Sequence, residues 1–143
     1  MFLIPTHSEH KLATMMNMDL NFAIANIKKL HDCAIITLKE RMIGLHAPLL
    51  MREFNQLVDD GIKHFIVDLS AVRIVDADGD YPLLHLLKCV YEVEGTVTLV
   101  CPIGNHIRVY YEATHYDTLF EIVETLDMAL AKMNIQTESQ LTH

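Results

Sequence analysis

The chain has 143 residues, of which 51% are hydrophobic and 21% are charged, so we expect one folded domain with a proper core and exclude a disordered chain. The formal net charge of −8 argues against a general nucleic-acid binder and against a basic membrane-binding surface, because both need clustered cations. No apolar run approaches the roughly 18 residues that a membrane-spanning helix needs.

The cysteines indicate a reducing compartment. Cys33, Cys89 and Cys101 are scattered, odd in number and each set among apolar neighbours, which is typical of buried free thiols. The opening residues, MFLIPTHSEH, lack the cationic start of a signal peptide. We therefore expect a cytoplasmic protein.

The first part of the chain predicts two strands and a helix. Residues 1–20 are Met-rich and poorly periodic, so we expect an irregular N-terminal segment. Residues 21–30 alternate apolar and polar like an edge strand, and 33–38 form a short β-branched run typical of a buried strand. A helix then begins near Pro48 and ends at Gly61.

The middle of the chain repeats this alternation. Residues 64–69 predict a buried strand, and 70–75 an apolar connector. Residues 79–94 have the spacing of an amphipathic helix that ends at Gly95, and 96–101 predict the next strand.

The last part predicts two more helices with a strand between them. Asn105 is placed to cap a helix that runs through Thr114, a strand follows over 119–123, and Thr125 caps a final helix. Residues 134–143 are polar and predict a tail.

The predicted order is thus β-β-α-β-α-β-α-β-α. Alternation of this kind favours an α/β fold with about five strands, mostly parallel in a mixed sheet, and four helices. We place the domain at residues 21–133.

Three aspartates alternate between a buried strand and a helix. Asp76, Asp78 and Asp80 belong to the stretch DADGD, which resembles the first motif of the haloacid dehalogenase superfamily, where one Asp attacks phosphorus and the next acts as general acid and base. That family has Thr or Val where this chain has Asp80, and the acidic pair it needs later is missing. An aspartate-nucleophile phosphatase is therefore the weakest of the functional alternatives.

Two other interpretations of the aspartates are a calcium loop and a helix start. An EF-hand loop needs Gly and Glu at positions held here by Tyr81 and Leu87. Acidic residues at a helix N-terminus are stabilised by its unpaired N–H groups, typically by ~0.3–1 kcal/mol each, and Pro82 suits the first turn. The sequence alone therefore favours an acidic helix start.

The context of the aspartates resembles a known family. The strand HFIVDLS, the spacer AVRIV and then DADG at a helix start are similar to the core signature of the STAS domain, found in anti-sigma factor antagonists and sulfate transporters. The family pattern is an apolar strand ending D-L-S and then D-S-S-G. Here Asp68–Ser70 match the first part, and Asp76–Gly79 occupy the second.

The resemblance implies a regulatory role for Asp78. In such antagonists the second Ser of D-S-S-G accepts phosphate from a kinase-type anti-sigma factor, and the unphosphorylated form binds that factor. Asp78 occupies this position and Ala77 the preceding one, so neither can form phosphoserine. Asp carries about −1 charge against roughly −1.5 to −2 for phosphoserine, so Asp78 either partly imitates the phosphorylated state or is a relic of a lost switch.

The resulting hypothesis is a non-catalytic partner-switching module in transcription regulation. The expected partner is an anti-sigma factor kinase or another STAS-containing regulatory protein, bound through Asp76, Ala77, Asp78, Gly79, Asp80 and Tyr81. Tyr81 is either an exposed anchor or a core residue. The alternative is a small-molecule or nucleotide-sensing STAS module. We expect no cofactor and no metal site, since the nine histidines form no known ligand motif.

Overall fold

The centre of the molecule is a five-stranded sheet. The computed structural model describes residues 24–141, for Ala77 and 134–141 only as backbone. The sheet has the order β1-β2-β4-β6-β7. Strand β1 runs antiparallel to β2, whereas β2, β4, β6 and β7 are parallel to one another. The strands are β1 (Ala25–Leu30), β2 (Cys33–Leu38), β4 (His64–Asp68), β6 (Thr96–Val100) and β7 (Glu121–Val123).

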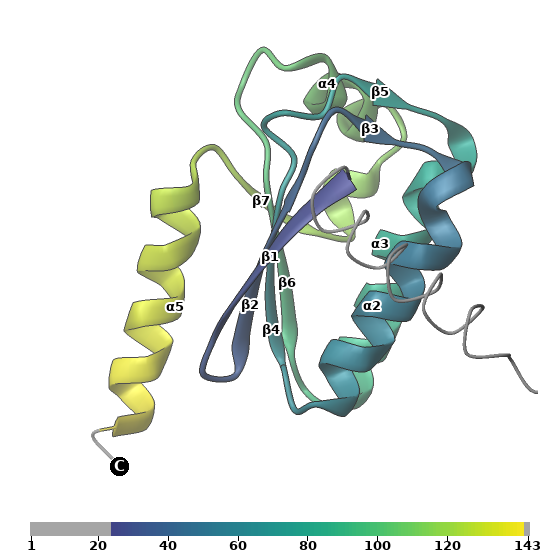
Figure 1. Cartoon of the computed structure of the whole chain (residues 1–143). Helices are drawn as coiled ribbons and strands as arrows, with labels where there is room; N and C mark the ends of the chain where they lie inside the picture. Colours follow the sequence, from purple (N-terminus) through teal and green to yellow (C-terminus); the bar gives the residue numbers. More distant parts are fainter. Residues whose placement is uncertain (1–23, 142–143) are drawn as a thin grey trace, which may run out of the picture.

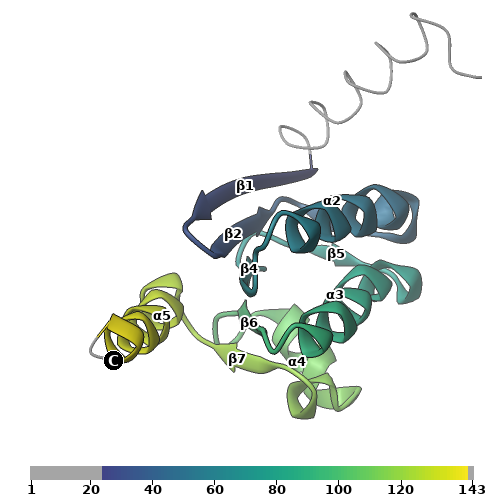
Figure 2. The same ribbon diagram turned by 90° about the horizontal axis from the view of Figure 1, so that it is seen from below.

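Helices cover both faces of the sheet, which gives three layers. Figures 1 and 2 show α2 and α3 side by side on one face and α5 on the other, while α4 lies beyond the ends of the strands. This arrangement follows from the parallel strands, whose connections must cross the sheet through helices. The helices are α2 (Ala47–Asp59), α3 (Tyr81–Glu92), α4 (His106–Ala113) and α5 (Leu126–Leu141).

Each side of the sheet has its own apolar core. The larger core joins the sheet to α2 and α3, where Phe54, Phe65 and Leu86 are almost completely buried. The smaller one lies under α5, where Ala129 packs in one cluster with Ile66. The central strands are therefore buried on both faces, as their continuous apolar runs indicated.

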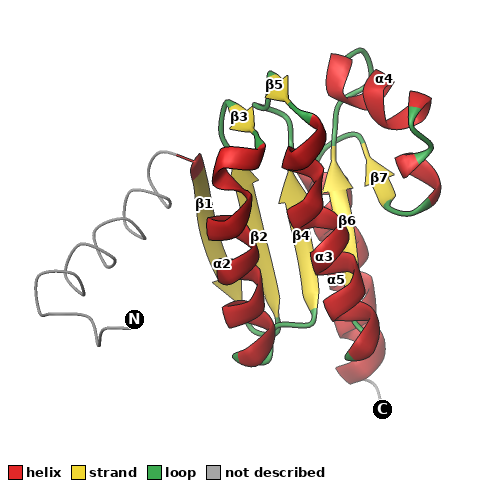
Figure 3. Cartoon of the chain, turned by 90° about the vertical axis from the view of Figure 1, so that its right-hand side faces the viewer, coloured by secondary structure: helices red, strands yellow, loops and turns green. Residues whose placement is uncertain are grey.

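Short elements gather at the carboxyl ends of the parallel strands (Figure 3). Strands β3 (Arg41–Met42) and β5 (Ile74–Val75) pair in parallel as a second, two-stranded sheet. Two single turns of 3₁₀ helix, η2 (Gly44–His46) and η3 (Ala77–Asp80), lead into α2 and α3. The aspartates of the DADGD stretch thus lie at the edge of the sheet where open α/β folds bind their ligands.

The expected α/β architecture, with its five-stranded mixed sheet and four helices, is confirmed. Local details differ. The connector over 70–75 ends in β5, the helix predicted from Gly79 begins with η3, and α5 continues to Leu141 although we expected a tail after Asn134. The irregular segment expected over 1–20 lies outside the described residues.

Candidate functional site

Asp76 joins two loops at the edge of the sheet. Its Oδ1 accepts backbone N–H groups from Gly79 at 2.8 Å and from Gly44 at 2.9 Å. The first contact caps η3, and the second ties η3 to the turn that precedes α2. Asp76 therefore fits the predicted helix-start role. A carboxylate held by two N–H donors is poorly suited to attack phosphorus, which weighs against the phosphatase hypothesis.

Gly79 allows η3 to approach the neighbouring chain closely. A Cβ atom at this position would lie 1.9 Å from the carbonyl oxygen of Met42. At Gly44, a Cβ atom would lie 2.6 Å from the Cβ of Asp78. No other residue fits at Gly79 unless the backbone moves. The close spacing of η3 and β3 therefore requires glycine, which has no side chain, at this position.

Asp80 points into the protein instead of capping the helix. It is 2% exposed, and the structure shows no side-chain cap for α3. Its Oδ2 accepts the hydroxyl of Tyr110 at 2.8 Å, and its Oδ1 accepts the hydroxyl of Tyr111 at 3.2 Å. Asp80 is therefore an internal hydrogen-bond acceptor and does not cap α3, because the two tyrosines on α4 provide buried donors for it.

Burial and hydrogen bonding change the pKa values of Asp80, Tyr110 and Tyr111. Burial raises the pKa of Asp80, although the hydrogen bonds from Tyr110 and Tyr111 work in the opposite direction. The bond to Asp80 raises the pKa of Tyr110 to about 12, and burial raises the pKa of Tyr111. Both phenols therefore remain protonated donors at neutral pH.

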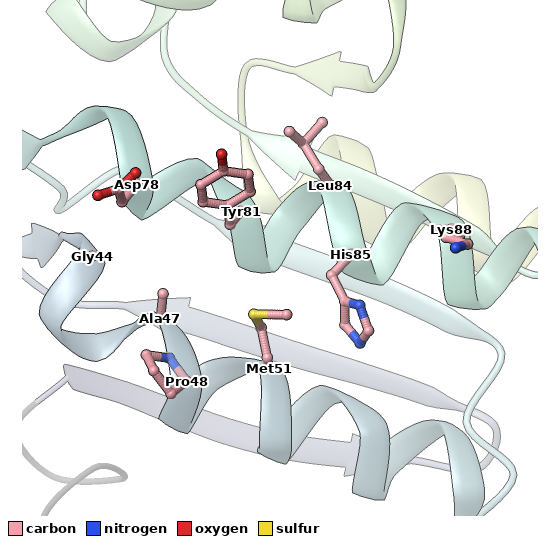
Figure 4. Close-up of a pocket in the computed structure, with 9 residues that line it drawn as sticks. All are labelled: Gly44, Ala47, Pro48, Met51, Asp78, Tyr81, Leu84, His85 and Lys88. Atoms are coloured by element: carbon pink, nitrogen blue, oxygen red, sulfur yellow. The ribbon is translucent and has the colours of Figure 1, made fainter.

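Asp78 differs from its two acidic neighbours. It is exposed, and no residue that the structure describes donates a hydrogen bond to its carboxylate. It lies at one end of a shallow groove of about 610 Å³ between α2 and α3. Figure 4 shows Met51 on α2 and His85 on α3 pointing into the space between the helices. The groove is lined by Gly44, Ala47, Pro48, Met51, Asp78, Tyr81, Leu84, His85 and Lys88.

Tyr81 stands beside Asp78 on the first turn of α3. Its side chain is 58% exposed, so the core-packing alternative is wrong and the tyrosine is available to a partner. The groove carries charge at both ends, with Asp78 in η3 at one end and Lys88 at the other, about two turns after the first residue of α3. An apolar segment with charges spaced to match these ends would fit this surface.

Two parts of this region could not be predicted from the sequence. Tyr110 and Tyr111 lie about thirty residues from Asp80, and Gly44 is equally far from Asp76. Nothing local in the sequence connects these positions. The sequence held one signal for Asp80, which is its position at the start of an apolar helix. A carboxylate buried there needs hydrogen-bond donors.

Among residues 24–133, no three His, Cys, Asp or Glu side chains lie together in a group that suits a metal ion. Over the described residues, no helix is long and apolar enough to cross a membrane.

Comparison with known proteins identifies the family. The STAS domain model matches residues 25–129, which is most of the chain. The chain belongs to the STAS domain family. No curated protein matches the chain significantly.

Several solved structures share the fold of this STAS domain. A Thermotoga maritima protein described as an anti-sigma factor antagonist has a TM-score of 0.68 at 21% identity, and the match covers 79% of this chain and 97% of that one. The Bacillus cell fate determinant SpoIIAA, in its phosphorylated form, has a TM-score of 0.62 at 12% identity, with 76% and 98% covered. A sulfate transporter family protein from Wolinella succinogenes has a TM-score of 0.63 at 16% identity, with 78% and 92% covered. At these identities the likeness establishes the fold alone.

Proposed function

We propose that this STAS domain is a non-catalytic, cytoplasmic regulatory module that binds a kinase-type anti-sigma factor through the groove between α2 and α3. The observation that carries the proposal is the state of Asp78, which is exposed and unpaired among the described residues, next to the exposed Tyr81. Asp76 and Asp80 are held by other groups of the protein. The name of several similar structures, anti-sigma factor antagonist, supports this class of partner.

Asp78 is proposed to stand at the phosphoacceptor position of the family and to imitate the phosphorylated form. SpoIIAA itself exists in an unphosphorylated and a phosphorylated form. A permanent carboxylate at the end of an apolar groove must lose water when a partner covers it, and this loss opposes binding unless the partner supplies a cation. The module would therefore remain in the weakly binding state without a kinase.

The test is a titration against each histidine-kinase-like anti-sigma factor of the source genome, purified separately. We expect Asp78→Ser to bind one of them at least tenfold more tightly than the native chain and to accept phosphate from it. In the Asp78→Ser background, Tyr81→Ala should weaken binding by a further tenfold. Tyr91→Ala is the matched control, because Tyr91 lies on the same helix, is 83% exposed and does not line the groove.

Each outcome decides one part of the proposal. If the native chain and Asp78→Ser bind one kinase equally well, Asp78 is a relic and the module is a permanently active antagonist. If neither binds any of these kinases, the anti-sigma hypothesis is wrong. A ligand panel that stabilises the chain in a saturable way would then support the sensing alternative.

A further inference from the structure

The groove between α2 and α3 has two opposite charges at its ends. Asp78 and Lys88 are both exposed, and neither forms an ion pair with another residue that the structure describes. They are the acidic and the basic residue of the groove lining, so this face is locally neutral although the whole chain has a net charge of −8. Two copies of the chain repel each other through their net charge, and a neutral face therefore favours their close approach.

Between the two charges the groove is mostly apolar. Met51 lies on the wall formed by α2, and Tyr81 and Leu84 lie on the wall formed by α3 (Figure 4). Tyr81 is 58% exposed, and Met51 and Leu84 are half-buried, so these side chains keep apolar surface in contact with water in a single copy. Covering this surface favours association, because apolar area is then removed from water.

A two-fold axis makes this face complementary to itself. Half a turn about an axis midway between the two charges exchanges their positions, so that Asp78 of each copy lies opposite Lys88 of the other. The axis passes near Leu83 and Leu84, which lie midway between the charges in the sequence. The α3 helices of the two copies then run antiparallel, and each can pack as a ridge against the groove of the other copy.

The same rotation brings two aromatic side chains together. Tyr81 and His85 lie on either side of the axis, so each Tyr81 faces His85 of the other copy. Asn55 of α2 holds His85 in position, with its Oδ1 atom 2.6 Å from Nε2 of the ring. An imidazole held in this way offers a flat surface on which a tyrosine ring can stack.

We propose that the groove between α2 and α3 is the interface of a symmetric homodimer, in which Asp78 pairs with Lys88 of the second copy at both ends. Ion pairs at an exposed rim contribute little affinity, but they fix the register and orientation of the two copies. The apolar side chains between them supply the affinity. This inference does not rest on the proposed function. A second copy and a protein partner would cover the same residues, so dimerisation would compete with binding of the partner.

The test is analytical ultracentrifugation of the full chain and of two charge reversals. We expect the native chain to sediment as a dimer at micromolar concentrations. Asp78→Lys or Lys88→Asp places like charges opposite each other at both ends, so either variant alone should self-associate at least tenfold more weakly. An equal mixture of the two variants should dimerise as tightly as the native chain, because every lysine at these positions then faces an aspartate.

Controls and the mixture separate this interface from other causes. Lys28→Asp and Asp117→Lys are the matched reversals, because both residues are exposed and neither lines the groove, and each variant should dimerise like the native chain. Circular dichroism confirms that each variant is folded, and a misfolded variant could not recover in the mixture. A monomeric native chain, a dimer that neither groove reversal weakens, or a mixture that does not recover would each overturn the proposal.

Discussion

The carboxylate of Asp80 is the most unusual side chain of the domain, because it is buried without a cation among the described residues. Its stabilisation comes from the hydroxyls of Tyr110 and Tyr111, which donate to its two oxygens. Hydrogen bonds to a charged group contribute about 1.5–3 kcal/mol each, whereas an unpaired buried carboxylate costs several kcal/mol. The two tyrosines therefore make an acidic residue tolerable at this position, and they connect η3 to α4.

We expect Asp80→Asn to change how stability depends on pH. The pKa of Asp80 is raised in the folded state, so the folded chain holds this proton more tightly than the unfolded chain. This contribution to stability is present at low pH and is lost as the pH rises through the folded-state pKa. Asn keeps the shape and the acceptor oxygen but does not ionise. The stability of the Asn variant relative to the native chain should therefore increase from about pH 4 to pH 7.

Urea denaturation of both proteins at several pH values measures this difference. Asp78→Asn serves as the control for removing a charge from the same loop, because Asp78 is exposed. Parallel stability curves for the native chain and Asp80→Asn would show that Asp80 ionises in the folded protein as readily as it does in water.

At the scale of elements, η3 packs closely against β3 at the carboxyl edge of the sheet. Gly79 consequently has no room for a side chain. The carbonyl of Met42 occupies the space that a Cβ on Gly79 would need. The same contact brings Gly44 within reach of Asp76. The start of α3 is thus fixed against the turn before α2, and this places Asp78 at the end of the groove.

Gly79→Ala should push η3 away from β3. The methyl group meets backbone atoms, which cannot rotate aside as a flexible side chain does, so we expect a loss of about 1–3 kcal/mol in the free energy of unfolding. Hydrogen exchange of the Gly44 and Gly79 amides should become faster, because both donate to Asp76. Asp78→Ala, at the exposed neighbouring position, should stay within about 0.5 kcal/mol of the native chain. Equal effects of the two substitutions would contradict the close packing.

At the scale of the whole molecule, the sheet separates two cores of unequal size. The larger one holds α2 and α3, which form the groove, and the smaller one holds α5. Because the two helical layers do not share a core, the packing of α5 can be disturbed with little effect on the groove.

Ala129→Asp should loosen α5 selectively. Ala129 is fully buried against the sheet, and a carboxylate there has no partner, so we expect a loss of about 2 kcal/mol or more. Amide exchange should increase in α5 while the amides of α2 and α3 stay protected. Met128→Asp is the control, because Met128 is 48% exposed on the same helix. A uniform increase of exchange across the domain would show instead that the two cores unfold as one unit.

The sequence by itself determined the layers of this protein. The apolar runs at 33–38, 64–69 and 96–101, separated by helical stripes, predict parallel strands buried on both faces, because periodicity and burial are local properties of the chain. The order of D-L-S and DADG also identified the family, which the family match confirms. The acidic helix start was likewise predicted, although the sequence did not assign the cap to one of the aspartates. Asp76 caps η3 through the N–H of Gly79, three residues away.

Only the tertiary structure decided what each of the alternating aspartates does. Asp76 binds the N–H of Gly44, Asp80 accepts the hydroxyls of two tyrosines, and Asp78 is exposed. The partners of Asp76 and Asp80, namely Gly44, Tyr110 and Tyr111, lie about thirty residues away in the sequence. The convergence of Asn55 with His85 was hidden for the same reason. Hydrogen bonds between distant parts of the chain depend on how helices and strands pack, and no local pattern encodes that packing.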